Sequence, residues 1–250
     1  SLLISAASKR VPPTLRLYSW VVPTLSLGYA QSIKDVDFTS LEQFGWGLVR
    51  RPTGGRAILH TDELTYSITA AIDDPLMAGS LLESYQRISK ALLLALEILE
   101  IKAIADSVYP TNGIQGGKEP VCFEVPSNYE ITVAGKKLIG SAQARKNNGV
   151  LQHGSLPLFG DLTRITKVLK YESEEKKNRS STALLAHAGT IESLTGLEIS
   201  HEQAQKAFIE GYSRSLGISF MASEPDSSEL EIAQELENTK YDSPVWTRRL

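Results

Sequence analysis

Residues 121–158 read VCFEVPSNYEITVAGKKLIGSAQARKNNGVLQHGSLPL, and this stretch decides the predicted fold. It contains three runs that are typical of strands, separated by short turns rich in glycine and asparagine. Such turns between extended segments are a strong hairpin signal. We therefore predict a three-stranded antiparallel meander, with strands at 129–133, 137–144 and 150–158 and turns at 135–136 and 146–149.

The meander carries small residues in the interior of its strands. Glycine weakens a strand, so small residues there often mark a place where a ligand lies against the backbone. We therefore interpret this part of the meander as a candidate binding site. The small residues are Gly140, Ser141, Ala142, Gly154 and Ser155.

The composition is ordinary for a globular protein: of 250 residues, 42% are hydrophobic and 22% are charged, with a formal net charge of −3. This whole-chain charge gives no indication of nucleic-acid binding. No apolar run approaches the ~20 residues needed to span a bilayer, so we expect no membrane segment. The single cysteine cannot form an intramolecular disulfide, which favours a reducing compartment, and we expect the protein to be cytoplasmic.

Charge is unevenly distributed along the chain. Residues 129–158 carry four basic residues against one acidic residue, a net charge of +3, whereas residues 223–242 carry a net charge of −6. A basic meander in an acidic chain indicates either an anionic partner near the sheet or a solvated charged face. Composition does not decide between these two readings.

The remaining pattern predicts strands first and helices later, which indicates an α+β fold with a largely antiparallel sheet. We expect strands at 14–20, 25–30, 48–51, 57–60 and 64–71, with 101–105 as a further candidate. We expect helices at 37–45, 81–100, 161–170, 190–195, 201–216 and 227–241, the last capped by Ser227 or Ser228. Residues 171–179 read as a charged, mobile surface segment, and residues 218–222 read as extended chain.

We expect residues 1–250 to form a single catalytic domain, because no repeat or low-complexity segment divides the chain. The first seven residues, SLLISAA, lack the basic region and the apolar length of a signal peptide. They read instead as the tail of a helix whose beginning is absent from the sequence.

A second stretch, RRPTGGRAILHTDELTYS at residues 50–67, combines two glycines with arginines. Gly54 and Gly55 leave backbone N–H groups open to a ligand, and the neighbouring arginines add positive charge. Taken alone, a Gly-Gly turn beside arginines is more often structural, so a structural turn and an anion site both stay open. The arginines are Arg50, Arg51 and Arg56, and His60 ends the following predicted strand.

Cys122 carries the only thiol of the chain. It follows a polar, glycine-rich loop at residues 112–119 and comes shortly before Pro126, which argues against a place in a core strand. A lone cysteine is more often an inert buried residue, whereas a thiolate beside a lysine can act as a nucleophile. The residues themselves leave both readings open.

Three sets of motifs together closely resemble the lipoate/octanoate transfer family. They are LRLYSW and LSLGYAQ, then RRPTGGRAILH and ELTYS, then CFEVPSNYEI, GKKLIGSAQAR and LQHGS, and they span residues 13–159. This family comprises cofactor-dependent lipoate–protein ligases and ATP-independent octanoyltransferases. The resemblance implies the biotin/lipoate protein ligase fold, which is class II synthetase-like: a mixed, largely antiparallel sheet flanked by helices.

The resemblance also implies roles for particular residues. Lys137 matches the family's lysine that contacts the reacting carboxyl or thioester, and Lys136 should point to the other face because strand side chains alternate. Cys122 resembles the nucleophile of the octanoyltransferases. The resemblance implies substrate binding by Arg51, Gly54, Gly55, His60, Gly140, Ser141, Gln152, His153 and Gly154. We expect the strands that bear these residues to lie in one sheet and to line a narrow apolar tunnel that ends near Cys122.

Two features favour the transferase over the ligase. The ligases usually read three glycines where this chain has Gly54-Gly55-Arg56, and they need no cysteine. The implied function is therefore octanoyl transfer from acyl carrier protein, through a thioester on Cys122, to a lysine of a lipoyl-accepting protein. The implied acceptor is a glycine-cleavage H protein or a dehydrogenase lipoyl domain, and the resemblance implies no required cofactor and no metal.

Two alternatives stay open. A lipoate–protein ligase would use ATP, Mg²⁺ and free lipoate. A non-catalytic relative would only bind lipoyl domains or acyl carrier protein, although the joint presence of Cys122, Lys137 and the Gly-Gly loop speaks against it.

Overall fold

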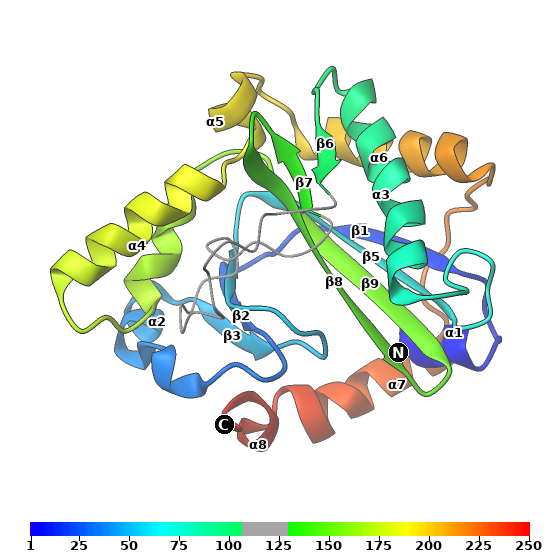
Figure 1. The fold of residues 1–250 in the computed structure, drawn as a ribbon. Coiled ribbons are helices and arrows are strands. Elements are labelled where there is room, and N and C mark those ends of the chain that lie inside the picture. Colours follow the sequence, from blue (N-terminus) through cyan, green and yellow to red (C-terminus); the bar gives the residue numbers. More distant parts are fainter. Residues whose placement is uncertain (107–129) are drawn as a thin grey trace.

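The structure is a computed structural model that describes residues 1–106 and 130–250. Its largest part is a six-stranded sheet in the order β1-β5-β9-β8-β7-β6, in which every neighbouring pair is antiparallel (Figure 1). The predicted α+β class with a largely antiparallel sheet is confirmed. The strands are β1 (Thr14–Tyr18), β5 (Glu63–Ala71), β6 (Ile104–Asp106), β7 (Glu130–Val133), β8 (Lys136–Lys146) and β9 (Gly149–Pro157).

The predicted meander is confirmed as β7, β8 and β9. Ala134 and Gly135 have φ values of 49° and 76° at the first turn, and Asn147 and Asn148 have φ values of 50° and 60° at the second. Two left-handed residues in succession match the twist of a two-residue hairpin loop. Asparagine tolerates this conformation better than most residues, so the chain can reverse without glycine at the second turn.

A separate three-stranded sheet, in the order β3-β2-β4, lies beside the large one. The strand β2 (Thr24–Leu27) pairs parallel with β3 (Gly47–Arg50) and antiparallel with β4 (Ile58–His60). The chain leaves β4 and enters β5 of the large sheet after only two residues, 61–62. The prediction that the Gly54-Gly55 segment shares one sheet with Lys137 is therefore wrong, because this segment connects β3 to β4.

Two helices, α3 (Leu81–Ile98) and α6 (His201–Leu216), pack on the large sheet (Figure 1). Tyr66 of β5 meets Phe208 and Tyr212 of α6, with ring centroids 6.1 and 6.4 Å apart. The two helices approach closely because Gly211 has no side chain: a Cβ there would lie 2.8 Å from the carbonyl oxygen of Ala91. Together with the sheet they form the main hydrophobic core.

A second core lies under the small sheet, among α2 (Phe38–Phe44), η3 (Leu162–Val168) and α4 (Glu174–His187). The interpretation of residues 171–179 as a mobile segment is wrong, since α4 begins within them. Ser173 caps this helix by accepting from the backbone N–H of Lys176, and Leu184 is buried in the core. The helix predicted at 161–170 is confirmed in place but is a 3₁₀-helix.

The remaining elements surround these two cores. Residues 218–222 form no strand, and Asp226 rather than a serine caps the helix that follows them. No helix among residues 1–106 and 130–250 is long and apolar enough to cross a membrane. The elements are α1 (Leu2–Ala7), η1 (Ile33–Asp35), α5 (Ile191–Thr195), α7 (Ser227–Leu236), the π-helix η4 (Glu237–Tyr241) and α8 (Pro244–Thr247).

Candidate active site

A cavity of about 1180 Å³ is lined by both sheets and is the candidate active site. Residues from β8 and β9 of the large sheet face residues from β4 and from the connection between β3 and β4. The two stretches singled out in the sequence therefore share one cavity although they belong to different sheets. The predicted residues that line it are Arg51, Gly54, Gly55, His60, Lys137, Gly140, Ser141, His153 and Gly154.

One predicted residue that the structure describes, Gln152, is not among this lining. Cys122 lies outside the described residues. Gln152 is fully buried behind the cavity wall, where it supports other side chains. Arginine, lysine and histidine side chains stand in the cavity walls. The narrow apolar tunnel ending near Cys122 stays a prediction, because Cys122 lies outside the described residues.

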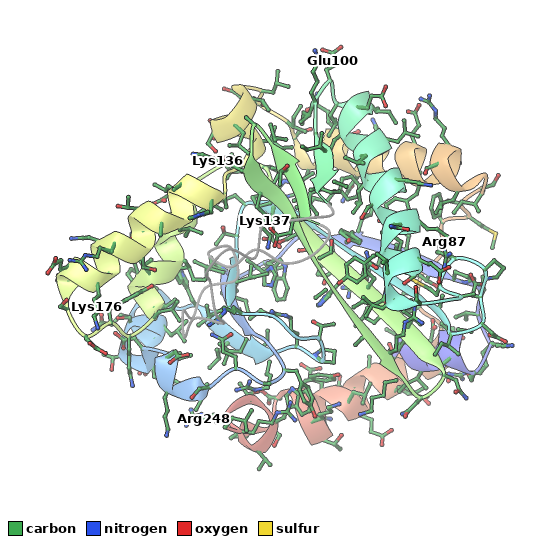
Figure 2. All side chains as sticks on the ribbon, viewed as in Figure 1. Arg87, Glu100, Lys136, Lys137, Lys176 and Arg248 are labelled. Carbon is green, nitrogen blue, oxygen red and sulfur yellow. The ribbon has the colours of Figure 1, made fainter. Side chains whose placement is uncertain are left out.

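Lys137 is 2% exposed, and its ammonium forms an ion pair with the Glu130 carboxylate. Lys136 points the other way, where its Nζ donates to the carbonyl oxygen of Leu185 in α4 at 2.6 Å. Figure 2 shows Lys137 near the centre of the molecule and Lys136 further out. The predicted separation of the two lysines onto opposite faces of β8 is confirmed.

Glu130 was not predicted as part of the site. It lies two residues before Thr132, which pairs with Lys137 across the β7–β8 hairpin. Long side chains reach diagonal neighbours on adjacent strands, so a lysine and a glutamate in this register can meet. A buried ammonium without a carboxylate would lose its proton or destabilise the fold. Glu130 therefore keeps Lys137 charged and in place inside the protein.

The segment of residues 51–57, which we call the glycine loop, is held by the side chain of Arg51. Its guanidinium donates to the carbonyl oxygens of Ser26, Gly54 and Arg56 at 2.9, 2.9 and 2.7 Å. The loop also packs tightly on Gly28, the residue after β2, since a Cβ there would lie 1.8 Å from the carbonyl oxygen of Gly55. Arg51 thus shapes the loop through the main chain, in addition to lining the cavity.

The two glycines of this loop differ in their surroundings. Gly55 has a φ of 93°, a conformation that side chains rarely adopt, so only glycine fits there without strain. Gly54 has no such φ, and a Cβ built on it would meet nothing within 4 Å. The main chain at Gly54 is therefore open on its cavity side, where a ligand can approach it.

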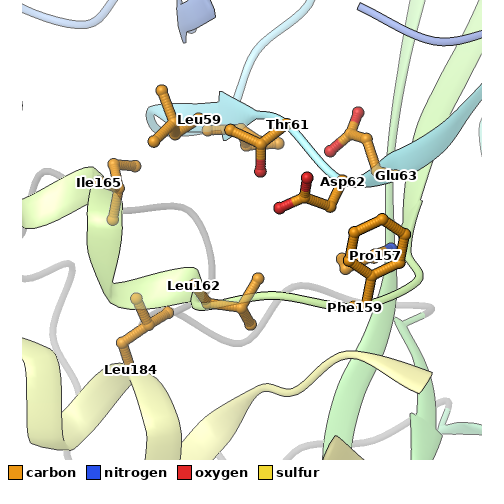
Figure 3. Close-up of a pocket in the computed structure, with 10 residues that line it drawn as sticks. Leu59, Thr61, Asp62, Glu63, Pro157, Phe159, Leu162, Ile165 and Leu184 are labelled. Carbon is orange, nitrogen blue, oxygen red and sulfur yellow. The ribbon is translucent and has the colours of Figure 1, made fainter. Parts of the chain in front are cut away.

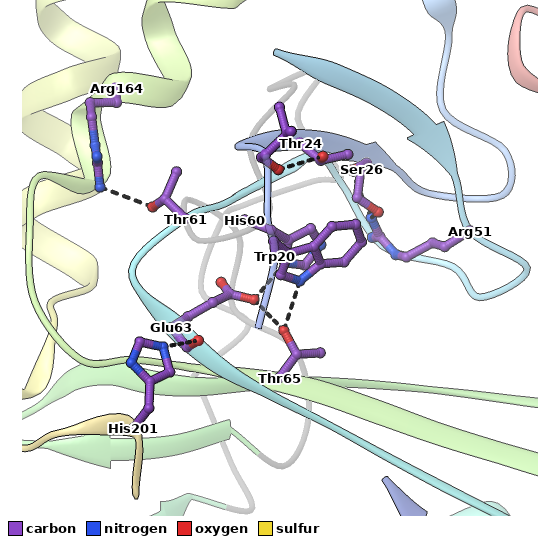
Figure 4. Close-up of polar contacts among 11 residues, drawn as sticks. Trp20, Thr24, Ser26, Arg51, His60, Thr61, Glu63, Thr65, Arg164 and His201 are labelled. Carbon is purple, nitrogen blue, oxygen red and sulfur yellow. Dashed lines mark hydrogen bonds and ion pairs between the residues drawn. The ribbon is translucent and has the colours of Figure 1, made fainter. Parts of the chain in front are cut away.

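His60 belongs to a hydrogen-bonded group that the sequence did not reveal (Figure 4). Its Nδ1 lies 2.6 Å from Glu63 Oε1, which also accepts from the Thr65 hydroxyl at 2.6 Å. Thr65 in turn accepts from the indole N–H of Trp20 at 2.9 Å, and the Trp20 and His60 rings stack with centroids 4.3 Å apart. This contact occupies Nδ1 of His60, which also lines the cavity.

His153 is the second histidine of the cavity, and its surroundings differ from those of His60. Its Nε2 lies 2.7 Å from the Thr53 hydroxyl. Burial, reinforced by the nearby charges of Arg51 and His60, lowers the pKa of His153 to about 3. The imidazole is therefore neutral at pH 7, and it can form hydrogen bonds to an uncharged carbonyl group without adding charge.

The floor of the cavity is a polar chain across β5, β8 and β9. The Tyr66 hydroxyl lies 2.6 Å from Ser141 Oγ and accepts from Gln152 Nε2 at 3.4 Å. Burial raises the pKa of Tyr66, so its hydroxyl stays protonated. Gly154 leaves room for this chain, since a Cβ there would lie 2.4 Å from the carbonyl oxygen of Gly140.

A second hollow, next to the Asp62–Arg164 ion pair, is too small to be an alternative site (Figure 3). Its volume of about 20 Å³ is enough for roughly one water molecule. Among residues 1–106 and 130–250, no group of three or more histidine, cysteine or acidic side chains could hold a metal ion. Of these two hollows, the large cavity is the one with room for a ligand bigger than a water molecule.

Solved structures show which fold this chain has. A bipartite lipoate–protein ligase with its E2 lipoyl domain, from Thermoplasma acidophilum, superposes with a TM-score of 0.80 at 22% identity, covering 99% of this chain and 89% of that one. A lipoate–protein ligase A bound with ATP superposes with a TM-score of 0.76 at 24% identity, covering 99% and 92%. The predicted biotin/lipoate ligase-like fold is confirmed.

The chain belongs to the family of the lipoyl protein ligase A/B catalytic domain, whose model matches residues 1–213. Among its curated relatives, an octanoyltransferase LipM of Carboxydothermus hydrogenoformans is 41% identical over 250 residues, covering 100% of this chain and 91% of the relative. The octanoyltransferase LipM of Bacillus subtilis is 36% identical, covering 98% and 90%. The predicted family and the predicted reaction class, an acyltransferase, are confirmed.

Proposed function

We propose that the chain is an octanoyltransferase that moves an octanoyl group from acyl carrier protein to a lysine of a lipoyl-accepting protein. The observation that carries this proposal is the meeting of Lys137, His153 and the glycine loop on one cavity. The similarity to curated octanoyltransferases over nearly the whole chain supports the same reading.

The first half of the proposed reaction loads Cys122. Its thiolate attacks the carbonyl carbon of the octanoyl thioester, the bond from that carbon to the pantetheine sulfur breaks, and the released thiolate takes up a proton. A free thiol has a pKa of about 8.5, so only a few per cent of it is ionised at neutral pH. A lysine ammonium nearby favours the thiolate, which is the role we assign to Lys137.

The second half transfers the chain to an amine. The neutral ε-amine of the acceptor lysine attacks the Cys122 thioester, the carbon–sulfur bond breaks, and an amide forms. The amine must lose a proton in this step. His60 is suited to accept it, because Glu63 holds Nδ1 and leaves Nε2 on the cavity side.

Both halves pass through a tetrahedral intermediate whose oxygen carries negative charge. Donors that are fixed before the reaction stabilise such an oxygen more than mobile ones do. Lys137 meets this condition because Glu130 fixes its ammonium. The open main chain at Gly54 and the neutral His153 can bind the carbonyl group without moving.

The proposal requires neither ATP nor Mg²⁺, since the energy of the donor thioester drives amide formation. We propose a glycine-cleavage H protein or a dehydrogenase lipoyl domain as the acceptor. The net charge of +3 over residues 129–158 supports binding of acidic partner proteins near the meander.

The decisive experiment compares wild type with Cys122→Ser. Given octanoyl-acyl carrier protein alone, wild type should gain one octanoyl adduct in its intact mass, and neutral hydroxylamine should remove it as it removes thioesters. The serine variant should fold and should form either no adduct or a stable ester, with no transfer to an acceptor. Transfer by the serine variant that needs ATP, Mg²⁺ and free lipoate would instead identify a ligase.

A further inference from the structure

Three cations near the cavity form no ion pair with a carboxylate among residues 1–106 and 130–250. They are Lys146, at the tip of the β8–β9 hairpin, and Lys240 and Arg249, in the C-terminal segment of residues 237–250. The lack of an ion pair is unexpected because acidic residues are close in the sequence: residues 223–242 carry a net charge of −6.

Aromatic rings hold two of these cations in place. The Lys240 ammonium lies 4.2 Å from the centroid of the Trp246 ring, and the Arg249 guanidinium lies 4.1 Å from it. Arg249 also lies 3.8 Å from the Tyr29 ring. Cation–π contacts orient a cation but do not neutralise its charge. The segment thus presents ordered positive charge.

The three cations are near enough to affect one another. The pKa of Lys240 is lowered by partial burial and then by the charges of Lys146 and Arg249. The exposed Tyr29 has its pKa lowered by Arg249, through a hydrogen bond and its charge, and also by Lys146 and Lys240. Figure 1 shows the tip of the β8–β9 hairpin on the same side of the molecule as α7. Like charges gathered in this way disfavour the free protein, and a bound anion would relieve their repulsion.

The C-terminal segment is anchored to the cavity wall. The buried Arg50 donates to the carbonyl oxygens of Thr247 and Arg249 at 3.2 and 3.0 Å and to that of Gly28 at 2.8 Å. Trp246 donates back to the carbonyl oxygen of Arg50 at 2.8 Å. Arg50 and Tyr241 both line the cavity, so the cations stand at its edge in a fixed position.

We propose that Lys146, Lys240 and Arg249 bind the phosphodiester at the outer end of the donor's phosphopantetheine arm. This rests on the proposed function. The arm carries its thioester at one end and its only anionic group at the other, so a cation site at the rim and the reacting groups inside match its two ends. Lysine and arginine are the usual ligands of phosphate oxygens.

The volume of the cavity leaves room for more than the acyl chain. At about 1180 Å³ it exceeds the roughly 300–1,000 Å³ that holds most drug-sized ligands. An eight-carbon chain would fill only part of this space. Lys240 and Arg249 lie beyond residue 213, where the match to the family model ends, whereas Lys146 lies within the match.

The test compares two soluble donors, octanoyl-pantetheine and octanoyl-4′-phosphopantetheine, with a lipoyl-accepting protein in excess. Wild type should show a kcat/KM for the phosphorylated donor roughly tenfold to 100-fold higher than for the other. This ratio should fall toward one in Lys240→Gln/Arg249→Gln and at high salt. The matched control is Lys206→Gln, an exposed lysine of α6 that pairs with Glu202 and should keep the wild-type ratio.

A wild-type kcat/KM ratio near one between the two soluble donors would overturn the proposal. It would also be overturned if the double variant showed the same loss of kcat/KM with both donors. If the variant loses only transfer from octanoyl-acyl carrier protein, these cations bind the carrier's surface and the phosphate assignment is wrong. Transfer by wild type from both soluble donors at equal rates would overturn this inference while supporting the proposed function. Absence of transfer from every donor would overturn the proposed function itself.

Discussion

Replacing either member of the buried Lys137–Glu130 pair should destabilise the fold far more than replacing both. Each side chain is 3% exposed. Removing one partner of such a pair leaves a buried charge uncompensated, which costs about 3–5 kcal/mol of the free energy of unfolding. For a chain of this length, ~1 kcal/mol shifts the melting temperature by about 2–4 °C, so Glu130→Gln and Lys137→Met should each lower it by roughly 6–20 °C.

The double variant Glu130→Gln/Lys137→Met removes both charges while it keeps two long side chains. Its loss in the free energy of unfolding should be roughly half, or less, of the sum of the two single-variant losses. The departure from additivity measures the coupling between the two residues. The exposed pair Lys206–Glu202 of α6 is the matched control, since both side chains are 75% exposed. Single substitutions there should leave the free energy of unfolding almost unchanged, because solvent screens an exposed ion pair.

Urea unfolding followed by tryptophan fluorescence gives the stabilities, and octanoyl transfer gives the activities. The double variant should be folded yet slow, because loss of an ammonium at a developing oxyanion costs about 3–4 kcal/mol of transition-state stabilisation. If Glu130→Gln costs no more than Glu202→Gln, or if the double variant loses the full sum, Glu130 does not hold Lys137 and our account of the site is wrong.

Three further outcomes are expected. Gly154→Ala should lower the free energy of unfolding in urea by about 1–3 kcal/mol, because its Cβ would lie 2.4 Å from a main-chain oxygen of β8. Gly54→Ala should be tolerated, because its Cβ would meet none of the described residues within 4 Å. Equal losses in the two variants would contradict this packing. The lowered pKa of His153 means that the unfolded chain binds a proton between about pH 6.5 and 3 that the folded chain does not. The free energy of unfolding should therefore fall by about 1.4 kcal/mol per pH unit as the pH is lowered through this window. In His153→Gln, urea unfolding over the same pH range should lack this contribution to the pH dependence. Lys136→Ala should reduce kcat/KM for transfer and its salt dependence only modestly, whereas Lys137→Ala should remove most activity, and equal losses would refute their separate roles.

The meander could be predicted because its determinants are local. Alternating side chains and turn residues that accept positive φ are visible in the sequence, and the structure places Ala134-Gly135 and Asn147-Asn148 at the two turns. The division into two sheets could not be predicted. The residues at 61–62 look like a turn between neighbouring strands, and only the pairing of β5 with β1 and β9 shows that the chain has changed sheets.

The lining of the cavity was predictable from motifs, whereas the partners of its side chains were not. Glu130 alternates with apolar residues in YEITV and therefore reads as solvent-exposed, although it is 2% exposed. Its burial depends on Lys137 in the next strand, and only the hairpin register brings the two together. Arg51 reads as a ligand-binding arginine for a similar reason, since its acceptors are main-chain carbonyls that have no signature in the sequence.

The inner and outer cations of the cavity differ in a way that bears on catalysis. Lys137 already has a carboxylate partner, so its position does not depend on a substrate, as its proposed role at the reacting carbonyl requires. Among the described residues, no carboxylate pairs with Lys146, Lys240 or Arg249. An arriving anion is therefore attracted more strongly by these three cations than by Lys137. Salt screens exposed charges strongly and buried ones weakly. Rising ionic strength should therefore raise the KM for a phosphorylated donor while it leaves kcat nearly constant.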